Sequence, residues 1–153
     1  MLSQKTRYAL EALILLADDE KARKGPVLIA DLAQRGNIPQ KFLEAILLEL
    51  KNHGILQSKK GKGGGYFLGK RAEEIYVGNI VRILQGSLAL LPCVSQSAYR
   101  RCDECRDEEA CGIRILFKEV RDATSEILDN TSLAKLQRLE ENARQNLVPT
   151  YAI

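Results

Sequence analysis

The sequence contains no tryptophan, and only 5% of its 153 residues are aromatic. A buried core must therefore be built from leucine, isoleucine, valine and alanine. No apolar run approaches the ~18 residues that a membrane-spanning helix requires, and the first residues lack the hydrophobic stretch of a secretory signal. We therefore expect a cytoplasmic protein with no membrane partner. The length suits one hydrophobic core rather than two.

Histidine and cysteine are scarce, and their positions are informative. The only histidine, His53, lies at the end of a predicted helix, where a capping or surface role is expected. The four cysteines are confined to one window of 19 residues, at Cys93, Cys102, Cys105 and Cys111. In a reducing cytosol, such a cluster is more typical of metal ligands or reactive thiols than of structural disulfides.

The pattern around the cysteines does not favour an enzyme. Cys102 and Cys105 form a Cys-x-x-Cys pair, which in thiol oxidoreductases opens a helix after a strand in a β-α-β unit. No such unit is visible around this pair, and no histidine and carboxylate form a catalytic arrangement. We therefore expect the protein not to be an enzyme.

Positive charge is concentrated in the first part of the chain. Residues 1–91 contain 14 Lys and Arg against 9 Asp and Glu, whereas residues 92–153 contain 9 against 11. The first part is therefore the one expected to meet a polyanion.

Apolar residues in this basic part recur at helical spacing. Helices are predicted from Ser3, a suitable N-cap, to about residue 20, and over 27–34, 40–53 and 77–84. The helix over 40–53 is expected to have an apolar stripe made of Phe42, Leu43, Ile46, Leu47 and Leu50. Gly54 suits the C-terminus of that helix.

Strand-like runs at 55–60 and 66–68 flank a glycine-rich basic loop and predict a β-hairpin. Helix, tight turn, helix and hairpin form the pattern of a winged helix-turn-helix, whose second helix enters the DNA major groove. Glutamine can pair with adenine, a carboxylate can accept from cytosine, and lysines can contact phosphates or a narrow minor groove. The expected DNA-binding residues are Ser3, Lys5, Arg7, Gln40, Lys41, Glu44, Lys59, Lys60, Gly61, Lys62, Gly63 and Gly64.

The longest helical pattern follows the cysteines. Six residues recur at spacings of three and four, starting at Ala110: Ala110, Ile113, Phe117, Val120, Thr124 and Ile127. Such a stripe packs either on the chain's own first domain or on a second copy of the helix. The dimer is the favoured interpretation, which makes Ile113, Phe117, Val120, Thr124 and Ile127 the predicted dimer interface. A short helix through Leu133, Leu136 and Leu139 follows.

The predicted fold is mainly α-helical with a small β-hairpin wing. Residues 1–88 are the predicted winged helix-turn-helix DNA-binding domain, and 89–109 a cysteine-containing sensor loop. Residues 110–144 are the dimerisation helix and a short C-terminal helix, and 145–153 a loosely ordered tail.

Several motifs resemble the Rrf-two family of bacterial winged-helix transcriptional regulators, which includes IscR-like and NsrR-like members. The similarity runs from about residue 2 to residue 140, and its most specific part is the glycine-rich wing, Lys60-Gly61-x-Gly63-Gly64-Gly65-Tyr66. The resemblance implies a homodimer that binds partly palindromic promoter DNA, with its interface on a helix matching 112–129. It also implies base contacts by Glu44 and minor-groove entry at Lys60, where the family usually has arginine.

The resemblance also bears on the cysteines. Cluster-binding members use three cysteines between the wing and the long helix, which match Cys93, Cys105 and Cys111, and IscR-like members add a histidine where this chain has Arg114. The gap between Cys93 and Cys105 is longer than usual in the family. Cys102 is an additional candidate ligand, because four cysteines suit an iron–sulfur cluster.

The expected function is a homodimeric transcriptional regulator of promoter DNA, controlled by an iron–sulfur cluster or by redox-active cysteines. A two-iron cluster is favoured over a four-iron one. Zinc is a lesser possibility, because zinc sites usually contain two close cysteine pairs and this window has one. The alternatives are a metal-free repressor that responds through thiols or an effector, and a protein-interaction adaptor.

Overall fold

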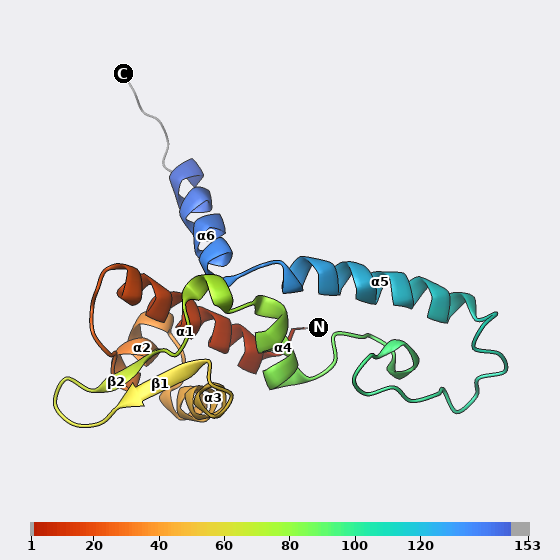
Figure 1. Cartoon of the computed structure of the whole chain (residues 1–153), viewed down its shortest axis with the longest axis horizontal. Helices are drawn as coiled ribbons and strands as arrows, with labels where there is room; N and C mark the ends of the chain where they lie inside the picture. Colours follow the sequence, from red (N-terminus) through yellow and green to blue (C-terminus); the bar gives the residue numbers. More distant parts are fainter. Residues whose placement is uncertain (1, 148–153) are drawn as a thin grey trace, which may run out of the picture.

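The computed structural model describes residues 2–147, which form a mostly helical molecule with one two-stranded hairpin (Figure 1). The predicted fold class is confirmed. The elements are the helices α1 (Gln4–Lys21), α2 (Ile29–Gly36), α3 (Gln40–Asn52), α4 (Val77–Gln85), α5 (Gly112–Asp129) and α6 (Leu133–Leu147), the strands β1 (Leu56–Lys59) and β2 (Gly65–Leu68), and the short 3₁₀ turns η1 (Ala72–Glu74) and η2 (Pro92–Val94). No helix of the described chain is both long and apolar enough to cross a bilayer.

The hydrophobic core is built around α1, which contacts α2, α3, α4, α6 and β2. Small side chains on α1, among them Ala9 and Ala12, are fully buried and let the neighbouring helices approach closely. The buried apolar side chains are all leucine, isoleucine, valine or alanine in the described residues. This confirms the core composition that the scarcity of aromatic residues predicted.

The wing is attached to the helical body by a short backbone bridge. β1 pairs antiparallel with β2, and Val27 then pairs with Tyr66 through two hydrogen bonds of 2.8 and 2.9 Å. A side chain at Gly65 would collide with this bridge, because its Cβ would lie 2.4 Å from the Val27 carbonyl oxygen. Since Val27 is engaged here, α2 begins at Ile29, two residues later than predicted.

Two other predictions require correction. Phe42 is 64% exposed, because Leu43, Ile46, Leu47 and Leu50 already fill the inner face of α3. The last helix is not short: it extends to Leu147, three residues into the segment predicted as a tail, and residues 148–153 lie outside the described residues.

α6 begins inside the main core. Leu133 and Ala134 are buried in the same hydrophobic cluster as α1, and Gln137 donates a hydrogen bond of 2.6 Å to Asp18 of α1. Lys21 and Glu141 form an exposed ion pair nearby. The remainder of α6 projects away from the helical body (Figure 1).

α5 is joined to the helical body at its C-terminal end. The Val77 amide donates to the Thr131 carbonyl at 2.9 Å, and the Leu133 amide donates to the Ile75 carbonyl at 2.7 Å. The N-terminal end of α5 is connected to the end of α4 by residues 86–111, which we call the cysteine loop. Figure 1 shows the loop running alongside α5 and turning back beyond its far end, away from α6.

Candidate DNA interface and cysteine pocket

The turn between α2 and α3 is tight because its residues adopt special conformations. Asn37 follows α2 in the left-handed region, with φ of 49°. Ile38 is buried, and its amide donates to the Ala33 carbonyl at 2.9 Å. A Cβ at Gly36 would lie 2.9 Å from the Ile38 side chain, which explains a small residue there. α3 is thereby set across the end of α2.

α3 presents its N-terminal polar residues to solvent. Gln40, Lys41 and Glu44, three of the predicted DNA contacts, are all exposed. The Gln40 amide donates to the Glu44 carboxylate at 3.3 Å, across one helical turn. Because these side chains need no rearrangement of the core to reach a ligand, the outer face of α3 is a candidate DNA-reading surface.

The wing tip is a compact turn that carries three exposed lysines, Lys59, Lys60 and Lys62. None of the three takes part in a salt bridge within residues 2–147. Gly61 and Gly63 have positive φ angles of 86° and 73°. The tip thus holds its positive charge on a loop with left-handed positions, which favour glycine.

Gly64 is buried at the base of the tip, and its amide donates to the Gly61 carbonyl at 3.0 Å. A Cβ at Gly64 would lie 2.2 Å from the Lys59 carbonyl oxygen. The glycine at this position therefore permits the close backbone approach that shapes the wing.

The start of α1 differs from the other two surfaces, because two of its three predicted phosphate contacts already have partners. The Ser3 hydroxyl caps α1 by accepting from the Thr6 amide at 3.1 Å. Lys5 forms a salt bridge with Glu49 of α3. Arg7 is exposed. Of this group, Arg7 is the one most open to a phosphate.

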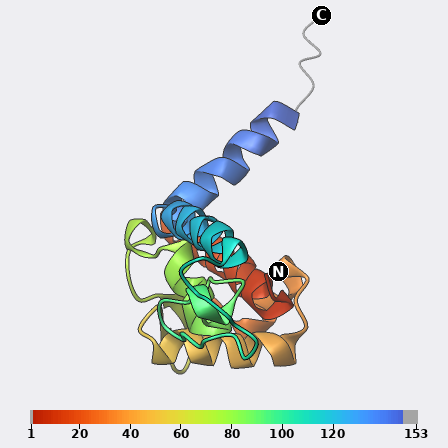
Figure 2. The same ribbon diagram turned by 90° about the vertical axis from the view of Figure 1, so that its right-hand side faces the viewer.

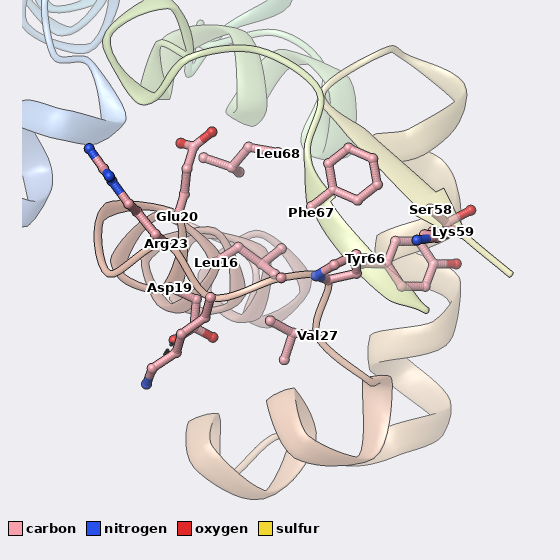
Figure 3. Close-up of a pocket in the computed structure, with 13 residues that line it drawn as sticks. Leu16, Asp19, Glu20, Arg23, Val27, Ser58, Lys59, Tyr66, Phe67 and Leu68 are labelled. Carbon is pink, nitrogen blue, oxygen red and sulfur yellow. Dashed lines mark ion pairs between the residues drawn. The ribbon is translucent and has the colours of Figure 1, made fainter. Parts of the chain in front are cut away.

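A pocket of about 520 Å³ lies between the end of α1 and the wing (Figure 3). Asp19 on its wall is buried and accepts two hydrogen bonds from Arg35, at 2.6 and 3.1 Å. The hydrogen bond from Arg35 is the main reason that the pKa of Asp19 lies below its usual value. Lys24 adds a second, longer ion pair at 3.6 Å. These contacts fix α1 against α2 beneath the wing.

The four cysteines come together on one pocket of about 670 Å³ at the N-terminal end of α5. Cys93, Cys105 and Cys111 are half-buried, Cys102 is exposed, and all four are free thiols. Cys102 and Cys105 share a turn, in which the Cys105 amide donates to the Cys102 carbonyl at 3.1 Å. The structure thus brings together all four predicted metal ligands.

The thiols are not arranged as a closed ligand shell. In the part of the chain that the structure describes, no three Cys, His, Asp or Glu side chains are placed to hold a metal ion. His53 does not line this pocket, and its Nδ1 is hydrogen bonded to the Glu49 carbonyl at 2.9 Å, as expected for a capping residue. The donor set nevertheless fits an iron–sulfur group, because four cysteine thiolates are the usual ligands of such clusters.

Arginines tie the cysteine loop to α5. Arg114 Nε donates to the Cys93 carbonyl at 3.3 Å, and Arg121 Nη1 donates to the Val94 carbonyl at 2.5 Å. Sequence reasoning placed Arg114 only as the residue at a histidine position, and it missed Arg121. No local pattern reveals these contacts, because each joins residues more than 20 positions apart.

The predicted interface residues lie on a helix with no buried side chain. Ile113 and Ile127 are 64% and 66% exposed, Val120 is also exposed, and Phe117 and Thr124 are half-buried. Leu116, which the heptad spacing did not include, adds to this exposed apolar surface. In the described chain, α5 therefore has an apolar stripe that its own core does not cover.

The position of α5 is set by a bidentate ion pair. Arg82 of α4 donates to the two carboxylate oxygens of Asp129, at 2.5 and 2.9 Å. This hydrogen bonding lowers the pKa of Asp129 and raises that of Arg82. The ion pair links the last turn of α5 to the helix that leads into the cysteine loop.

Comparisons with known proteins agree with this architecture. The family model Rrf2, described as an iron-dependent transcriptional regulator, matches residues 2–138. An rrf2-like HTH-type transcriptional regulator of Rhodobacter capsulatus is 42% identical over 134 residues, which cover 87% of this chain and 89% of the relative.

Two solved structures are also similar. The structure of CymR, the global cysteine regulator of B. subtilis, has a TM-score of 0.75 and 31% identity, and the match covers 91% of this chain and 97% of CymR. IscR of T. potens has a TM-score of 0.73 and 25% identity, with 94% and 90% of the two chains covered. The chain therefore belongs to the Rrf2 family, whose members are transcriptional regulators and not enzymes.

Proposed function

We propose that the protein is a homodimeric regulator that binds promoter DNA and whose DNA affinity is controlled by an iron–sulfur cluster on the cysteine loop. The observation that carries the proposed control is the convergence of all four cysteines on one pocket at the start of α5. Cysteines kept only as apolar filler would be buried in the core, whereas Cys102 is exposed and the other three are half-buried.

DNA binding is supported by three exposed groups on one winged helix-turn-helix. α3 would enter the major groove, where Gln40 and Glu44 can contact base edges and Lys41 a phosphate. The wing lysines would contact the adjacent backbone or minor groove, and Arg7 the backbone beside α1. The specificity would come from α3, and much of the affinity from the cations.

Dimerisation is supported by the uncovered stripe of α5. Ile113, Phe117, Val120 and Ile127 would pack against the same residues of a second copy, as a two-fold interface requires. The two DNA-binding domains would then be held at a separation set by the paired α5 helices. That separation decides which half-site spacing the dimer can occupy.

The cluster would be held by Cys93, Cys105 and Cys111, with Cys102 as the fourth ligand. An iron–sulfur cluster supplies a redox-active centre whose assembly depends on iron and sulfide. The residues of this chain supply the connection to DNA binding. Arg114 and Arg121 hold the backbone of Cys93 and Val94 on α5, and the ion pair of Asp129 with Arg82 holds α5 on α4. A change in the loop conformation would therefore act on the orientation of α5.

The decisive experiment is anaerobic reconstitution with iron and sulfide, followed by absorption spectroscopy and by assay of iron, sulfide and zinc. The wild type is expected to show visible absorbance and to change its affinity for a duplex selected from a random library when the cluster is lost. The visible absorbance should be abolished by each of Cys93→Ala, Cys105→Ala and Cys111→Ala. If Cys102 is the fourth ligand, Cys102→Ala should also reduce the absorbance. Ser97→Ala, at an exposed position of the same loop, is the control. Variants that bind a coloured cluster as the wild type does would refute the assignment.

A metal-free thiol switch is the second candidate, and the shared turn of Cys102 and Cys105 favours it. Mild oxidation would join these two sulfurs, with the oxidant accepting the two electrons and the two thiol protons released. A reconstituted protein that stays colourless, but forms this disulfide and changes its DNA affinity, would establish the switch. Cys102→Ser should then abolish the response, whereas Cys93→Ser should not.

A further inference from the structure

The outer face of α3 carries an apolar pair that the predicted base contacts do not include. Four exposed residues lie at spacings of four, three and four along the helix, and they form the outer stripe: Lys41, Ala45, Leu48 and Asn52. This stripe lies opposite the buried residues Leu43, Ile46, Leu47 and Leu50. Its centre is apolar, because Leu48 is 52% exposed and Ala45 is also exposed.

We infer that Leu48, with Ala45 beside it, forms a subsite for the C5-methyl groups of thymine in the major groove. The inference rests on the proposed DNA binding and specifies what the centre of the reading helix recognises. Thymine is the base that presents a methyl group in that groove, and apolar side chains recognise it by contact. Leu48 lies two turns from the start of α3, on the face that points away from the core.

The surroundings of the pair favour DNA over a protein partner. Lys41 and Lys51 lie near the two ends of the apolar pair, and both are exposed, as is Glu44 beside it. A stable protein interface buries ~800 Å² on each partner, which is far more than Leu48, Ala45 and the neighbouring exposed Phe42 provide. Figure 2 shows α3 along the lower edge of the molecule, away from α5 and α6, so the dimer stripe does not extend to this surface.

The size of Ala45 also matters. With only a Cβ at this position, the helix axis can approach the floor of the groove, and the longer Leu48 then reaches one turn further along. Gln40 and Glu44 lie together on one flank of the stripe, joined by their hydrogen bond of 3.3 Å. The polar contacts and the methyl contact would therefore be made to neighbouring base pairs.

The test uses the full-length protein and a duplex selected from a random library by the wild type. Each thymine of the selected site is replaced in turn by deoxyuridine, which lacks the methyl group. The wild type is expected to lose about three- to fivefold in affinity at one or two thymines of each half-site. Leu48→Ala and Leu48→Gln should bind the original duplex more weakly and lose the sensitivity to deoxyuridine at those positions.

Leu139→Ala is the matched control, because Leu139 is 55% exposed on α6. It should keep the full deoxyuridine sensitivity. The inference is overturned if the wild type tolerates deoxyuridine everywhere, if both Leu48 variants remain fully sensitive, or if they change the oligomeric state instead of DNA binding. Failure to select any preferred duplex would overturn the proposed promoter binding itself, which distinguishes the two failures.

Discussion

Arg114, on the first turn of α5, donates a hydrogen bond from Nε to the backbone carbonyl of Cys93, at 3.3 Å. The side chain at the position where the family resemblance predicts a histidine thus holds a candidate cysteine segment through its backbone. This contact leaves the Cys93 thiol available on the pocket. It gives Arg114 a positioning role that does not depend on metal ligation.

We predict that Arg114→Ala loosens the segment around Cys93. Loss of one hydrogen bond worth about 1 kcal/mol should raise amide hydrogen exchange in residues 93–96 by roughly fivefold. Exchange in α1 should not change. Arg106→Ala, on the same loop, should leave the rates near those of the wild type. Equal effects of the two substitutions would show that the Arg114 contact does not order the segment.

The exposed apolar stripe of α5 predicts that charged substitutions at two isoleucines differ in their effect on dimerisation. Ile127→Asp should place a charge in the proposed interface and convert dimers to monomers at micromolar concentration in sedimentation velocity runs. Ile115 is also half-exposed, but it lies on the other side of α5, beside Glu119. Ile115→Asp should remain dimeric. A wild type that sediments as a monomer would refute the dimer.

Lys60→Ala should lower both DNA affinity and the dependence of that affinity on salt. For each DNA phosphate that the protein no longer neutralises, the slope of log K against log salt concentration should become shallower by about 0.9. Lys135→Ala, an exposed lysine on α6, is the control and should leave the slope unchanged. Binding of the wild type that is independent of salt would support an adaptor rather than a DNA-binding regulator.

The buried Asp19 predicts a specific pH dependence of stability. Its pKa is lower in the folded protein than the ~3.9 of the unfolded chain, because Arg35 donates hydrogen bonds to it. The stabilisation is therefore complete above about pH 4 and disappears as the pH falls through the folded value. Asp19→Asn should reduce the free energy of unfolding at pH 7 by about 1 kcal/mol, and by less at pH 3. Urea unfolding measures both values, and Glu11→Gln is the control.

The effect of Gly78→Ala on stability should change sign when Asp129 is also replaced. A Cβ at this position would lie 1.9 Å from Asp129 Oδ1, so Gly78→Ala should displace the carboxylate from Arg82 and destabilise the protein by about 1 kcal/mol. In an Asp129→Ala background that clash is absent, and the remaining close contact, 3.0 Å to Arg82 Nη1, is to the end of a flexible side chain that can move aside. The same substitution should then stabilise α4 by about 0.5 kcal/mol, as alanine does in helices. Thermal unfolding of the wild type, the two single variants and the double variant measures both effects in a double-mutant cycle.

Periodicity in the sequence predicted most of the helices because their burial follows the helical repeat. The stripe on α5 placed that helix to within two residues of its start, and the inner face of α3 was correct except at Phe42. The start of α2 was misplaced, since the bridge from Val27 to Tyr66 joins residues far apart in sequence. α6 was predicted too short, although no glycine or proline interrupts the chain before Leu147.

The candidate sites were predictable as residue types but not as contacts. A glycine-rich basic hairpin and a cluster of cysteines are local patterns, and the structure places both as compact groups. The partners of Lys5 and of Asp19 depend on how helices cross, and the anchoring of Cys93 depends on an irregular loop. Such contacts are set by tertiary packing, which a local pattern does not encode.

The ion pair between Arg82 of α4 and Asp129 of α5 has a consequence for how the length of the cysteine loop can change. Because the ion pair of Arg82 and Asp129 holds the C-terminal end of α5 on α4, the two helices that flank the cysteine loop are joined at a point outside the loop. The entropic cost of closing a flexible loop grows only with the logarithm of its length, by about 0.6 kcal/mol for each doubling. Residues can therefore be inserted between Cys93 and Cys105 with little loss of stability. The length of the proposed sensor loop can therefore change while the helices of the DNA-binding domain keep their packing.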